Sequence, residues 1–347
     1  MNSEPPERDF SLIADEPSED AVPDRNVAME LVRVTEYGAL AAARWIGKGE
    51  KELADGAAVD AMRLALNNIS MDGIVVIGEG EKDEAPMLYN GEQIGDGSPP
   101  QVDIAVDPLE GTELTAMGFP NALTVIALAE RGAMFNPGPA VYMEKMATSP
   151  SLAHVLDMYK PLGEIVKAIA KERDCDIGDV VVMMLDRPRH EEQVKEIREA
   201  GARIRFILHG DVSGSILAAQ EGSPVDLLWG IGGTPEGVIS ACAIKCLGGQ
   251  ILGRLWPRTD EEKQKIVDAG LELRDVLDRD RLVQGENAFF AATGVTDGDV
   301  LEGVRYLSSG AATTESLAMR SKSGTVRRIA ARHDRAKLRR ITGERVG

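Results

Sequence analysis

The chain has 347 residues, with 39 Lys and Arg residues against 57 Asp and Glu residues and a formal net charge of −18. Binders of nucleic acid or of anionic membranes neutralise phosphates with basic side chains, so this charge argues against both classes. No apolar run reaches the about 18 residues that a membrane-spanning helix needs, and the length favours two domains. We therefore expect a cation or a small molecule as the partner, with no nucleic acid and no membrane.

The first residues have the composition of a disordered acidic tail. Residues 1–24 hold eight acids, one Arg and four Pro, a composition that cannot bury enough apolar surface to offset the entropy of ordering. They also lack the basic and apolar regions of a signal peptide. Three cysteines, Cys175, Cys242 and Cys246, follow no disulfide spacing, so we expect a cytoplasmic protein. Cys242 and Cys246 should simply pack in a helix, since no nearby His or Cys completes a zinc site.

The predicted elements that follow are typical of an α/β protein. A helix with Asp24 as its N-cap and a second helix starting at Asp55 precede three apolar strands, at residues 73–77, 102–106 and 122–128. From residue 176 onward strands and helices alternate, with strands at 180–185, 204–208 and 225–229 and helices at 189–200 and after Asp211. We therefore predict two α/β domains, residues 25–170 and residues 171–340, with a boundary between residues 160 and 178.

Residues 320–340 reverse the charge of the rest of the chain, with nine Lys or Arg residues and one Asp. We expect a solvated terminal helix or strand with a basic face. An RNA-binding arm is the alternative.

Acidic residues occur where α/β proteins place their sites, at strand ends and helix starts. Asp55 begins the second predicted helix, where it could be a simple N-cap. Glu79 leaves the strand at 73–77 between two glycines, which allow close backbone approach or an unusual φ. A solvated turn is the structural alternative for this segment, although such a turn rarely needs so many acids.

The sequence DPLEGT at residues 107–112 is the most informative of these features. A buried strand ends at Asp107, and Pro108 forces a turn. Gly111 and Thr112 then offer a backbone N–H and a hydroxyl at a predicted helix start. Two carboxylates about 4 Å apart repel by roughly 4 kcal/mol at an effective dielectric of about 20, so Asp107 and Glu110 need a cation between them. Without His or Cys nearby, Mg²⁺ or Mn²⁺ fits better than zinc, and a pair of loop caps is the structural alternative.

Two further segments suit a phosphate. Residues 230–237 (GIGGTPEG) fail the dinucleotide fingerprint at Pro235 and are interpreted as a glycine-rich turn that opens a helix, offers N–H groups and adds Glu236 as a ligand. Arg187 and Arg189 follow a strand and precede a helix, where two guanidinium groups could bind a phosphate. A plain tight turn and ordinary surface arginines are the alternatives. Metal carboxylates facing such groups, with no Walker motif or kinase loop, indicate hydrolysis of a phosphate monoester.

With these motifs the sequence resembles the class II bacterial fructose-1,6-bisphosphatases, within the lithium-sensitive phosphatase superfamily that includes the inositol monophosphatases. The DPLEGT segment resembles the metal-binding signature of the superfamily. The resemblance to class II runs from about residue 27 to 335, through the segments at 33–36, 54–58, 77–81, 83–89, 115–118, 142–145, 187–190 and 230–233. It implies a layered α/β/α/β/α sugar-phosphatase fold with the site in a cleft between two domains, and a homodimer or homotetramer.

The resemblance also implies a set of site residues. The implied ligands of Mg²⁺ or Mn²⁺ are Asp55, Glu79, Asp107, Glu110 and Glu236, and the implied catalytic residues are Thr112, Lys51 and Glu79. The implied substrate contacts are Glu110, Gly111, Thr112, Tyr142, Arg187, Pro188, Arg189, His209, Gly210, Asp211 and Gly233. Two positions depart from the family pattern, which often has Lys in place of Arg187 and Asp in place of His209.

The expected activity is hydrolysis of the 1-phosphate of fructose 1,6-bisphosphate, a reaction of gluconeogenesis. Residues 186–190 (DRPRH) are similar to those of cyanobacterial members that also act on sedoheptulose 1,7-bisphosphate, so dual specificity stays open. A related inositol- or nucleotide-type monophosphatase is the enzyme alternative, against which the two arginines argue. A non-catalytic metal- or metabolite-binding regulator is the alternative of another class, and the intact Thr112 and Lys51 argue against it.

Overall fold

The computed structural model describes residues 26–80 and 87–342. The acidic tail, the Asp24 cap and part of the motifs at 77–81 and 83–89 lie outside these ranges. Within them, no helix combines the length and apolar character needed to cross a membrane. All three cysteines are free, and Cys242 and Cys246 are buried in one helix, as predicted.

Two β-sheets organise the chain. The first has eight strands in the order β12-β13-β11-β4-β3-β1-β2, with β14 beside β13. Its strands are β1 (Asp72–Ile77), β2 (Gln93–Ile94), β3 (Gln101–Glu110), β4 (Leu123–Glu130), β11 (Phe289–Gly294), β12 (Arg305–Tyr306), β13 (Ala311–Arg320) and β14 (Thr325–Asp334). The second has six strands in the order β10-β9-β5-β8-β6-β7. These are β5 (Tyr142–Thr148), β6 (Val181–Leu185), β7 (Arg203–Ile207), β8 (Leu227–Gly233), β9 (Gln250–Leu255) and β10 (Leu277–Asp278).

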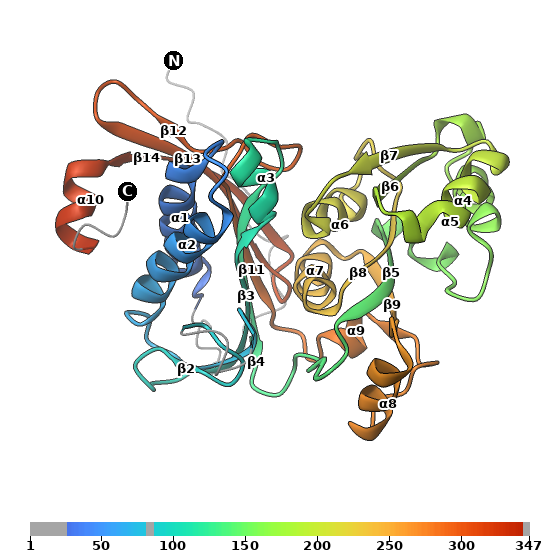
Figure 1. Ribbon diagram of the computed structural model, residues 1–347, viewed down its shortest axis with the longest axis horizontal. Helices are drawn as coiled ribbons and strands as arrows, with labels where there is room; N and C mark the ends of the chain where they lie inside the picture. The colour runs from blue at the N-terminus through green and yellow to red at the C-terminus, as the bar shows by residue number, and fades with distance from the viewer. Residues whose placement is uncertain (1–25, 81–86, 343–347) are drawn as a thin grey trace, which may run out of the picture.

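Helices cover both outer faces and fill the space between the sheets (Figure 1). The α-helices are α1 (Ala28–Ala42), α2 (Lys51–Leu66), α3 (Thr112–Met117), α4 (Leu162–Glu172), α5 (Glu191–Ala200), α6 (Asp211–Ala219), α7 (Thr234–Leu247), α8 (Asp260–Asp268), α9 (Arg279–Leu282) and α10 (Arg335–Thr342). Short 3₁₀ turns are η1 (Ala43–Trp45), η2 (Pro150–Val155), η3 (Ile177–Asp179) and η4 (Pro188–His190). Helices α1 and α2 lie outside the first sheet, α6 and α7 between the sheets, and α4 and α5 outside the second.

The hydrophobic core follows these layers. One buried cluster joins α1 and α2 to the first sheet, another joins α4 and α5 to the second, and the largest unites both sheets through α6 and α7. Strand β6 shows the arrangement, because Val182 packs toward the outer helices while Met183 packs toward the middle layer. A strand buried on both faces has few polar positions, which explains its continuous apolar sequence. The α/β prediction is confirmed, and the layers are those of α/β/α/β/α.

The two sheets do not divide the chain at residue 170, where the sequence pattern placed a domain boundary. Strand β5 precedes that position and belongs to the second sheet, whereas β11 to β14 return to the first. The composition of a segment can indicate that it is a strand but not which strand it pairs with. Strand β4 pairs with β11, which lies more than 150 residues later in the chain (Leu123↔Gly294). Such a long-range pairing leaves no local signal in the sequence.

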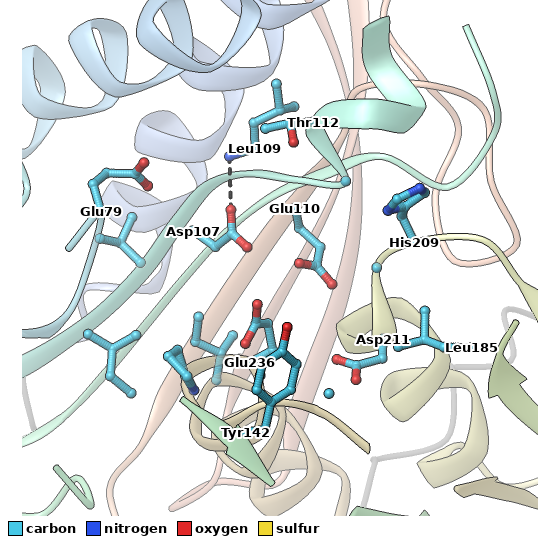
Figure 2. Close-up of a pocket in the computed structure, with 18 of the residues that line it drawn as sticks. Glu79, Asp107, Leu109, Glu110, Thr112, Tyr142, Leu185, His209, Asp211 and Glu236 are labelled. Carbon is cyan, nitrogen blue, oxygen red and sulfur yellow. Dashed lines mark hydrogen bonds between the residues drawn. The ribbon is translucent and has the colours of Figure 1, made fainter. Parts of the chain in front are cut away.

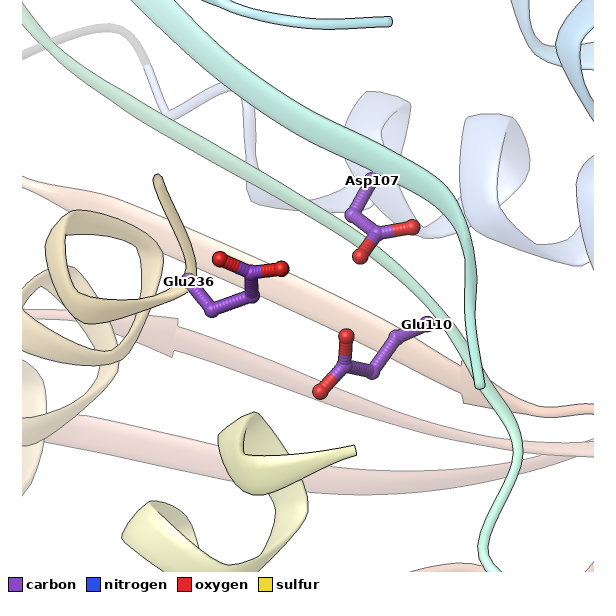
Figure 3. A group of neighbouring side chains, drawn as sticks. All are labelled: Asp107, Glu110 and Glu236. Atoms are coloured by element: carbon purple, nitrogen blue, oxygen red, sulfur yellow. The ribbon is translucent and has the colours of Figure 1, made fainter. Parts of the chain in front are cut away.

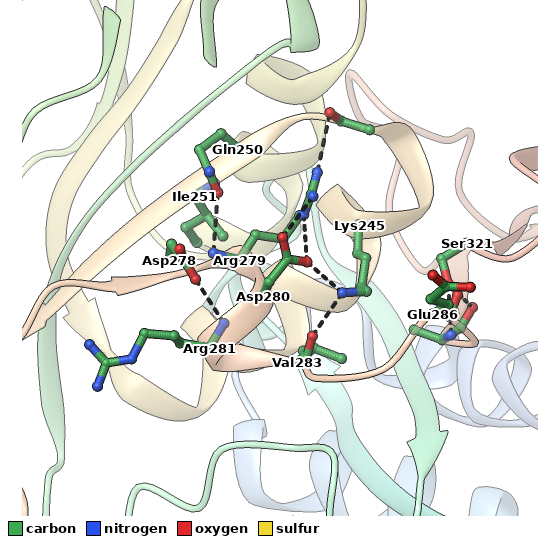
Figure 4. A network of polar contacts seen from close by, with 12 residues as sticks. Lys245, Gln250, Ile251, Asp278, Arg279, Asp280, Arg281, Val283, Glu286 and Ser321 are labelled. Carbon is green, nitrogen blue, oxygen red and sulfur yellow. Dashed lines mark hydrogen bonds and ion pairs between the residues drawn. The ribbon is translucent and has the colours of Figure 1, made fainter. Parts of the chain in front are cut away.

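Helix α9 anchors the return of the chain to the first sheet, as Figure 4 shows. Lys245 Nζ, on α7, contacts Asp280 Oδ1 at 2.6 Å and donates to the carbonyl oxygen of Val283 at 2.9 Å. Arg279 donates to the carbonyl oxygen of Gly249 at 2.8 Å. The middle helix layer and the end of the second sheet are thereby fixed to the segment that leads into β11.

Three predicted elements need correction. Helix α2 begins at Lys51, so Asp55 lies one turn inside it and is not an N-cap. Strand β3 continues to Glu110, because a register shift between Asp107 and Glu110 accommodates Pro108 in a bulge. The glycine-rich segment before α7 is not a turn but the end of β8, paired with β5 from Tyr142↔Gly233 onward.

The other predicted strands and helices occur close to their expected positions. Residues 320–340 comprise the end of β13, a turn, β14 and most of α10, as expected of a terminal strand or helix, and Arg327, Arg328 and Arg332 of β14 are exposed.

Candidate active site

A cleft of about 550 Å³ opens between the two sheets, and the predicted site residues converge on it (Figure 2). The first sheet and its helices contribute α2, the end of β1, the end of β3 and the start of α3. The second sheet and the middle layer contribute the start of β5, the segment after β6, and the N-terminal ends of α6 and α7. The predicted residues that line it are Asp55, Glu79, Asp107, Glu110, Gly111, Thr112, Tyr142, Arg187, Arg189, His209, Gly210, Asp211, Gly233 and Glu236.

Five of these residues form what we call the acidic cluster: Asp55, Glu79, Asp107, Glu110 and Glu236. Figure 3 shows the carboxyl groups of Asp107, Glu110 and Glu236 directed toward one another, although Glu236 comes from the other side of the cleft. One oxygen of each lies within 4.8 Å of the others. The β3 bulge explains the first two positions, because it turns both side chains into the cleft while Leu109 N–H donates to Asp107 Oδ1 at 3.1 Å.

Burial and mutual repulsion disfavour the charged forms of these acids. Burial, followed by the charges of neighbouring carboxylates, raises the pKa of Asp107 to about 8 and that of Glu110 well above its usual range. Burial and the adjacent Asp55 likewise raise the pKa of Glu79 to about 8. The pKa of Asp55 and that of Glu236 are also raised, chiefly by burial. The cluster therefore has a strong electrostatic reason to bind a cation.

Donor chemistry in the cluster fits a hard divalent cation. All five side chains offer carboxylate oxygens, the ligands that Mg²⁺ and Mn²⁺ prefer. Glu236 Oε2 is buried and has no hydrogen-bond partner among the described residues. Its side chain folds back over Gly233, where a Cβ would overlap the carboxylate. A buried carboxylate oxygen without a hydrogen-bond partner, packed against a glycine, is what we expect in a site that binds a metal ion.

Two glycines hold the backbone around Glu110. Gly111 precedes α3 with φ +88°, and Gly210 precedes α6 with φ +77°, conformations that side chains disfavour. A Cβ on Gly210 would lie 3.4 Å from Glu110 Oε1. That oxygen accepts a hydrogen bond from Val212 N–H, in the first turn of α6, at 3.0 Å. The first sheet and the middle layer therefore meet at one carboxylate.

Lys145 is a site residue that the sequence analysis did not select. Its side chain is 0% exposed, and Nζ lies 2.9 Å from Asp211 Oδ1, 2.8 Å from Asp211 Oδ2 and 3.0 Å from the carbonyl oxygen of Gly233. Asp211 is thus already paired with a cation, whereas no ion pair joins the five acids of the cluster to a basic side chain of residues 26–80 and 87–342. The signal was a lysine in the otherwise buried strand β5, within the 142–145 segment, because a buried lysine requires a charged partner.

A second group of residues lines the same cleft, and we call it the arginine side: Arg187, Arg189, Tyr142 and His209. Arg189 Nε and Nη2 donate to the carbonyl oxygen of Ile231 at 3.1 and 2.6 Å, and its guanidinium lies 5.3 Å from the Tyr142 ring centre. Arg187 Nη2 lies 3.4 Å from His209 Nδ1. Burial, then the Arg187 charge, lowers the pKa of His209, so its ring does not add to the positive charge near neutral pH.

Two predicted residues do not line the cleft. Lys51 opens α2 with 53% of its side chain exposed, and its Nζ lies 3.8 Å from Glu52 Oε1. Pro188 begins the η4 turn and lines a separate groove beside α5. Lys51 is nevertheless only one helical turn from Asp55, and Pro188 connects the two arginines, so both belong to segments that position cleft residues.

Comparison with known proteins agrees with this geometry. A sequence model of the family described as "Bacterial fructose-1,6-bisphosphatase, glpX-encoded" matches residues 25–333. The chain belongs to this family. Metal dependence is general among these fructose-1,6-bisphosphatases, and Asp107, Glu110 and Glu236 lie close enough together to hold a metal ion.

Curated relatives cover nearly the whole chain. The protein named "Fructose-1,6-bisphosphatase 1 class 2" from Escherichia coli (strain K12) is 44% identical over 322 residues, which are 89% of this chain and 95% of the relative. "Fructose-1,6-bisphosphatase class 2" from Shigella flexneri has the same identity and coverage. The resemblance to class II fructose-1,6-bisphosphatases is therefore confirmed.

Proposed function

We propose that this member of the glpX-encoded family hydrolyses fructose 1,6-bisphosphate to fructose 6-phosphate and inorganic phosphate with the help of a divalent metal. One observation supports the proposal: the five acids and the two arginines line a single cleft. A bisphosphate presents one phosphate to each side, so both sides have a role only for such a substrate. The names of the curated relatives support the same reaction.

Asp55, Glu79, Asp107, Glu110 and Glu236 would hold the metal, which we propose to be Mg²⁺ or Mn²⁺. When bound, such a cation supplies Lewis-acid chemistry, which makes water a better nucleophile and stabilises negative charge on phosphate oxygens. The raised pKa values support this role, because ligands that are costly to ionise alone ionise readily beside a cation.

Residues of the chain position the reacting groups. Gly111 and Thr112 open α3 and would bind the oxygens of the 1-phosphate through a backbone N–H and the hydroxyl. Glu79 would orient the attacking water and accept its proton. A bond then forms between the water oxygen and phosphorus, the bond from phosphorus to O1 of the sugar breaks, and O1 takes up a proton from solvent to leave as the sugar hydroxyl. We propose that Lys51, one turn before Asp55, offsets negative charge that develops nearby.

The arginine side would hold the rest of the substrate. Arg187 and Arg189, connected by Pro188, would bind the 6-phosphate, so binding energy remote from the reaction favours bisphosphates. Tyr142, His209, Gly210, Asp211 and Gly233 also line the cleft and would contact the sugar. His209 is a neutral donor or acceptor where the family often has Asp, so we expect its contact to a sugar hydroxyl to tolerate a longer sugar. Sedoheptulose 1,7-bisphosphate is therefore a second candidate substrate.

Location and assembly follow from the same reasoning. The three free cysteines support a cytoplasmic location. The family resemblance supports a homodimer or homotetramer.

A phosphate-release assay tests the proposal. Fructose 1,6-bisphosphate, sedoheptulose 1,7-bisphosphate, fructose 1-phosphate and inositol 1-phosphate are compared at equal concentration, each with Mg²⁺ and with Mn²⁺. We expect fast release from the bisphosphates and slow release from the monophosphates. Equal rates on inositol 1-phosphate would favour the monophosphatase alternative, and no release with either metal would favour a non-catalytic regulator.

A further inference from the structure

Strand β8 extends beyond the strand that should pair with it on one side. Strand β6 pairs with β8 only at Val182↔Leu227 and Met183↔Leu228, then ends at Leu185 and leads into the η4 turn. Strand β8 continues to Gly233 at the cleft. Backbone N–H and C=O groups in a buried strand need hydrogen-bond partners. Here the side chains of η4 provide these partners, in place of the backbone groups of a neighbouring strand.

His190 is the first of these partners. Its side chain is completely buried, and its Nε2 accepts a hydrogen bond from Ile231 N–H at 3.0 Å. Its Nδ1 lies 2.8 Å from the carbonyl oxygen of Leu185, which can only accept. One tautomer satisfies both contacts, the neutral ring with its proton on Nδ1. Burial lowers the pKa of His190, and the charges of Arg189 and Arg187 lower it further, which keeps the ring neutral.

Arg189 is the second partner, and it binds the same residue as His190, on the peptide unit that follows. While Ile231 N–H is held by His190, the carbonyl oxygen of Ile231 accepts from Nε and Nη2 of Arg189. These two bonds occupy two of the five guanidinium N–H groups, which leaves three for a ligand in the cleft. The direction of the remaining N–H groups therefore depends on where Ile231 is held.

We propose that His190 is a positioning residue for substrate selectivity, which fixes Ile231 so that its carbonyl oxygen directs Arg189 toward the far phosphate of a bisphosphate. The inference rests on the role of Arg189 in the proposed function. The edge of the Trp229 ring system meets His190 with ring centres 5.2 Å apart, and this packing holds the imidazole plane in place. His190 thus acts through Ile231, the residue whose carbonyl oxygen holds Arg189, and its second hydrogen bond, to Leu185, fixes the ring to the end of β6.

Substitutions at position 190 separate the two contacts. His190→Asn keeps a donor near the position of Nδ1 but has no acceptor for Ile231 N–H, whereas His190→Gln places an amide oxygen near the position of Nε2. We expect His190→Asn to raise KM for fructose 1,6-bisphosphate about tenfold, and His190→Gln about threefold or less. The ratio of kcat/KM for the bisphosphate to that for fructose 1-phosphate should fall about tenfold in His190→Asn, because only the bisphosphate uses Arg189.

A cycle with Arg189→Ala distinguishes this inference from the proposed function. In the Arg189→Ala background, His190→Asn should change the substrate ratio by less than about twofold, since the side chain it positions is gone. His154→Asn, at an exposed histidine whose side chain is 62% exposed, is the matched control and should leave the ratio unchanged. If Arg189→Ala leaves the ratio unchanged, the proposed far-phosphate site is wrong. If Arg189→Ala lowers it and His190→Asn does not, the inference about His190 alone is overturned.

A measurement on the unmodified protein tests the same contacts and does not depend on whether a variant folds. The chain has four histidines, so long-range ¹H–¹⁵N spectra can resolve the ring nitrogens of each. We expect the spectra to show His190 neutral at pH 7, with a proton on Nδ1 and none on Nε2. A proton on Nε2 would contradict the bond from Ile231 N–H and overturn the inference.

Discussion

The acidic cluster and the arginine side of the cleft differ in whether their charged groups already have partners within the protein. The acidic cluster gathers five carboxyl groups whose pKa values are raised by burial, and one oxygen of Glu236 has no partner among the described residues. The arginine side and its surroundings are already satisfied, since Arg189 bonds to Ile231 and Lys145 neutralises Asp211. In the proposed function the first side would bind a cation, whereas the second would be preorganised for an anion before any ligand arrives.

The largest effect should come from removing an acid of the cluster. Glu79→Gln keeps the size of the side chain but removes a metal ligand and the proposed proton acceptor. Loss of a residue that only hydrogen-bonds to a metal ligand costs about 10-fold to 100-fold in activity. Loss of a ligand itself should cost more, so we expect kcat to fall at least about 100-fold at saturating Mn²⁺. Steady-state phosphate release measures it.

Glu199→Gln is the control for that experiment, because Glu199 lies on α5, does not line the cleft and has 68% of its side chain exposed. Its kcat should stay within about twofold of the unmodified protein. A Glu79→Gln variant with unchanged kcat would show that Glu79 is neither a ligand nor a proton acceptor.

Next to the arginine side, the largest effect should come from breaking the buried ion pair between Lys145 and Asp211. Lys145→Met leaves Asp211 as a buried carboxylate without its cation, and removing one partner of a buried ion pair costs about 3–5 kcal/mol. Urea unfolding monitored by circular dichroism measures the free energy of unfolding.

Two further variants decide whether the pair is the cause. Lys145→Met with Asp211→Asn should recover a large part of the loss, because no uncompensated charge remains. Lys195→Met, at a side chain that is 76% exposed, should change stability by less than about 0.5 kcal/mol. Equal losses in the single and double variants would mean that packing, and not charge, holds Lys145 in place.

A smaller effect should appear in the pH dependence of stability without metal. Acids whose pKa is raised by folding bind more protons in the folded state, so stability falls as pH rises from the unfolded values near 4 toward the folded values of about 8 for Glu79 and Asp107. Each such group contributes a slope of up to about 1.4 kcal/mol per pH unit. Urea unfolding in EDTA at pH 5, 6.5 and 8 should show the decline.

Two comparisons assign that decline to the cluster. Saturating Mn²⁺ should reduce it, because the cation replaces protons on the carboxylates. Glu79→Gln should make it shallower, since one titrating group is removed, while Glu36→Gln removes a buried acid outside the cleft whose pKa burial raises to about 7. Stability that rises with pH in EDTA would contradict the raised pKa values.

The sequence was sufficient to predict the acids of the cluster and insufficient to predict how they are held. Asp107 and Glu79 follow apolar strands, and strand ends in α/β proteins converge, so their meeting could be expected. Asp55 was identified for the wrong structural reason, since it lies inside α2 rather than at its cap. The glycines at the end of β8 resembled a turn because their pairing with β5 joins segments almost 90 residues apart.

Contacts between distant side chains were beyond the sequence for the same physical reason. The pairing of Lys145 with Asp211 and the contact of His190 with Ile231 depend on how β5, β6 and β8 lie beside each other. The sequence around each of these residues has no unusual composition that would mark the contact. Only the assembled sheet shows that Lys145 is a counter-ion and that His190 replaces a missing strand partner.

The return of β11 to β14 to the first sheet has a consequence for synthesis on the ribosome. Strand β4 pairs with β3 on one side and with β11 on the other, and β11 begins only at Phe289. While the intervening segment is being translated, β4 presents an open and largely apolar edge, the kind of surface that promotes aggregation. The scaffold beneath the acidic cluster is therefore completed late, and the edge of β4 stays open until β11 has been synthesised.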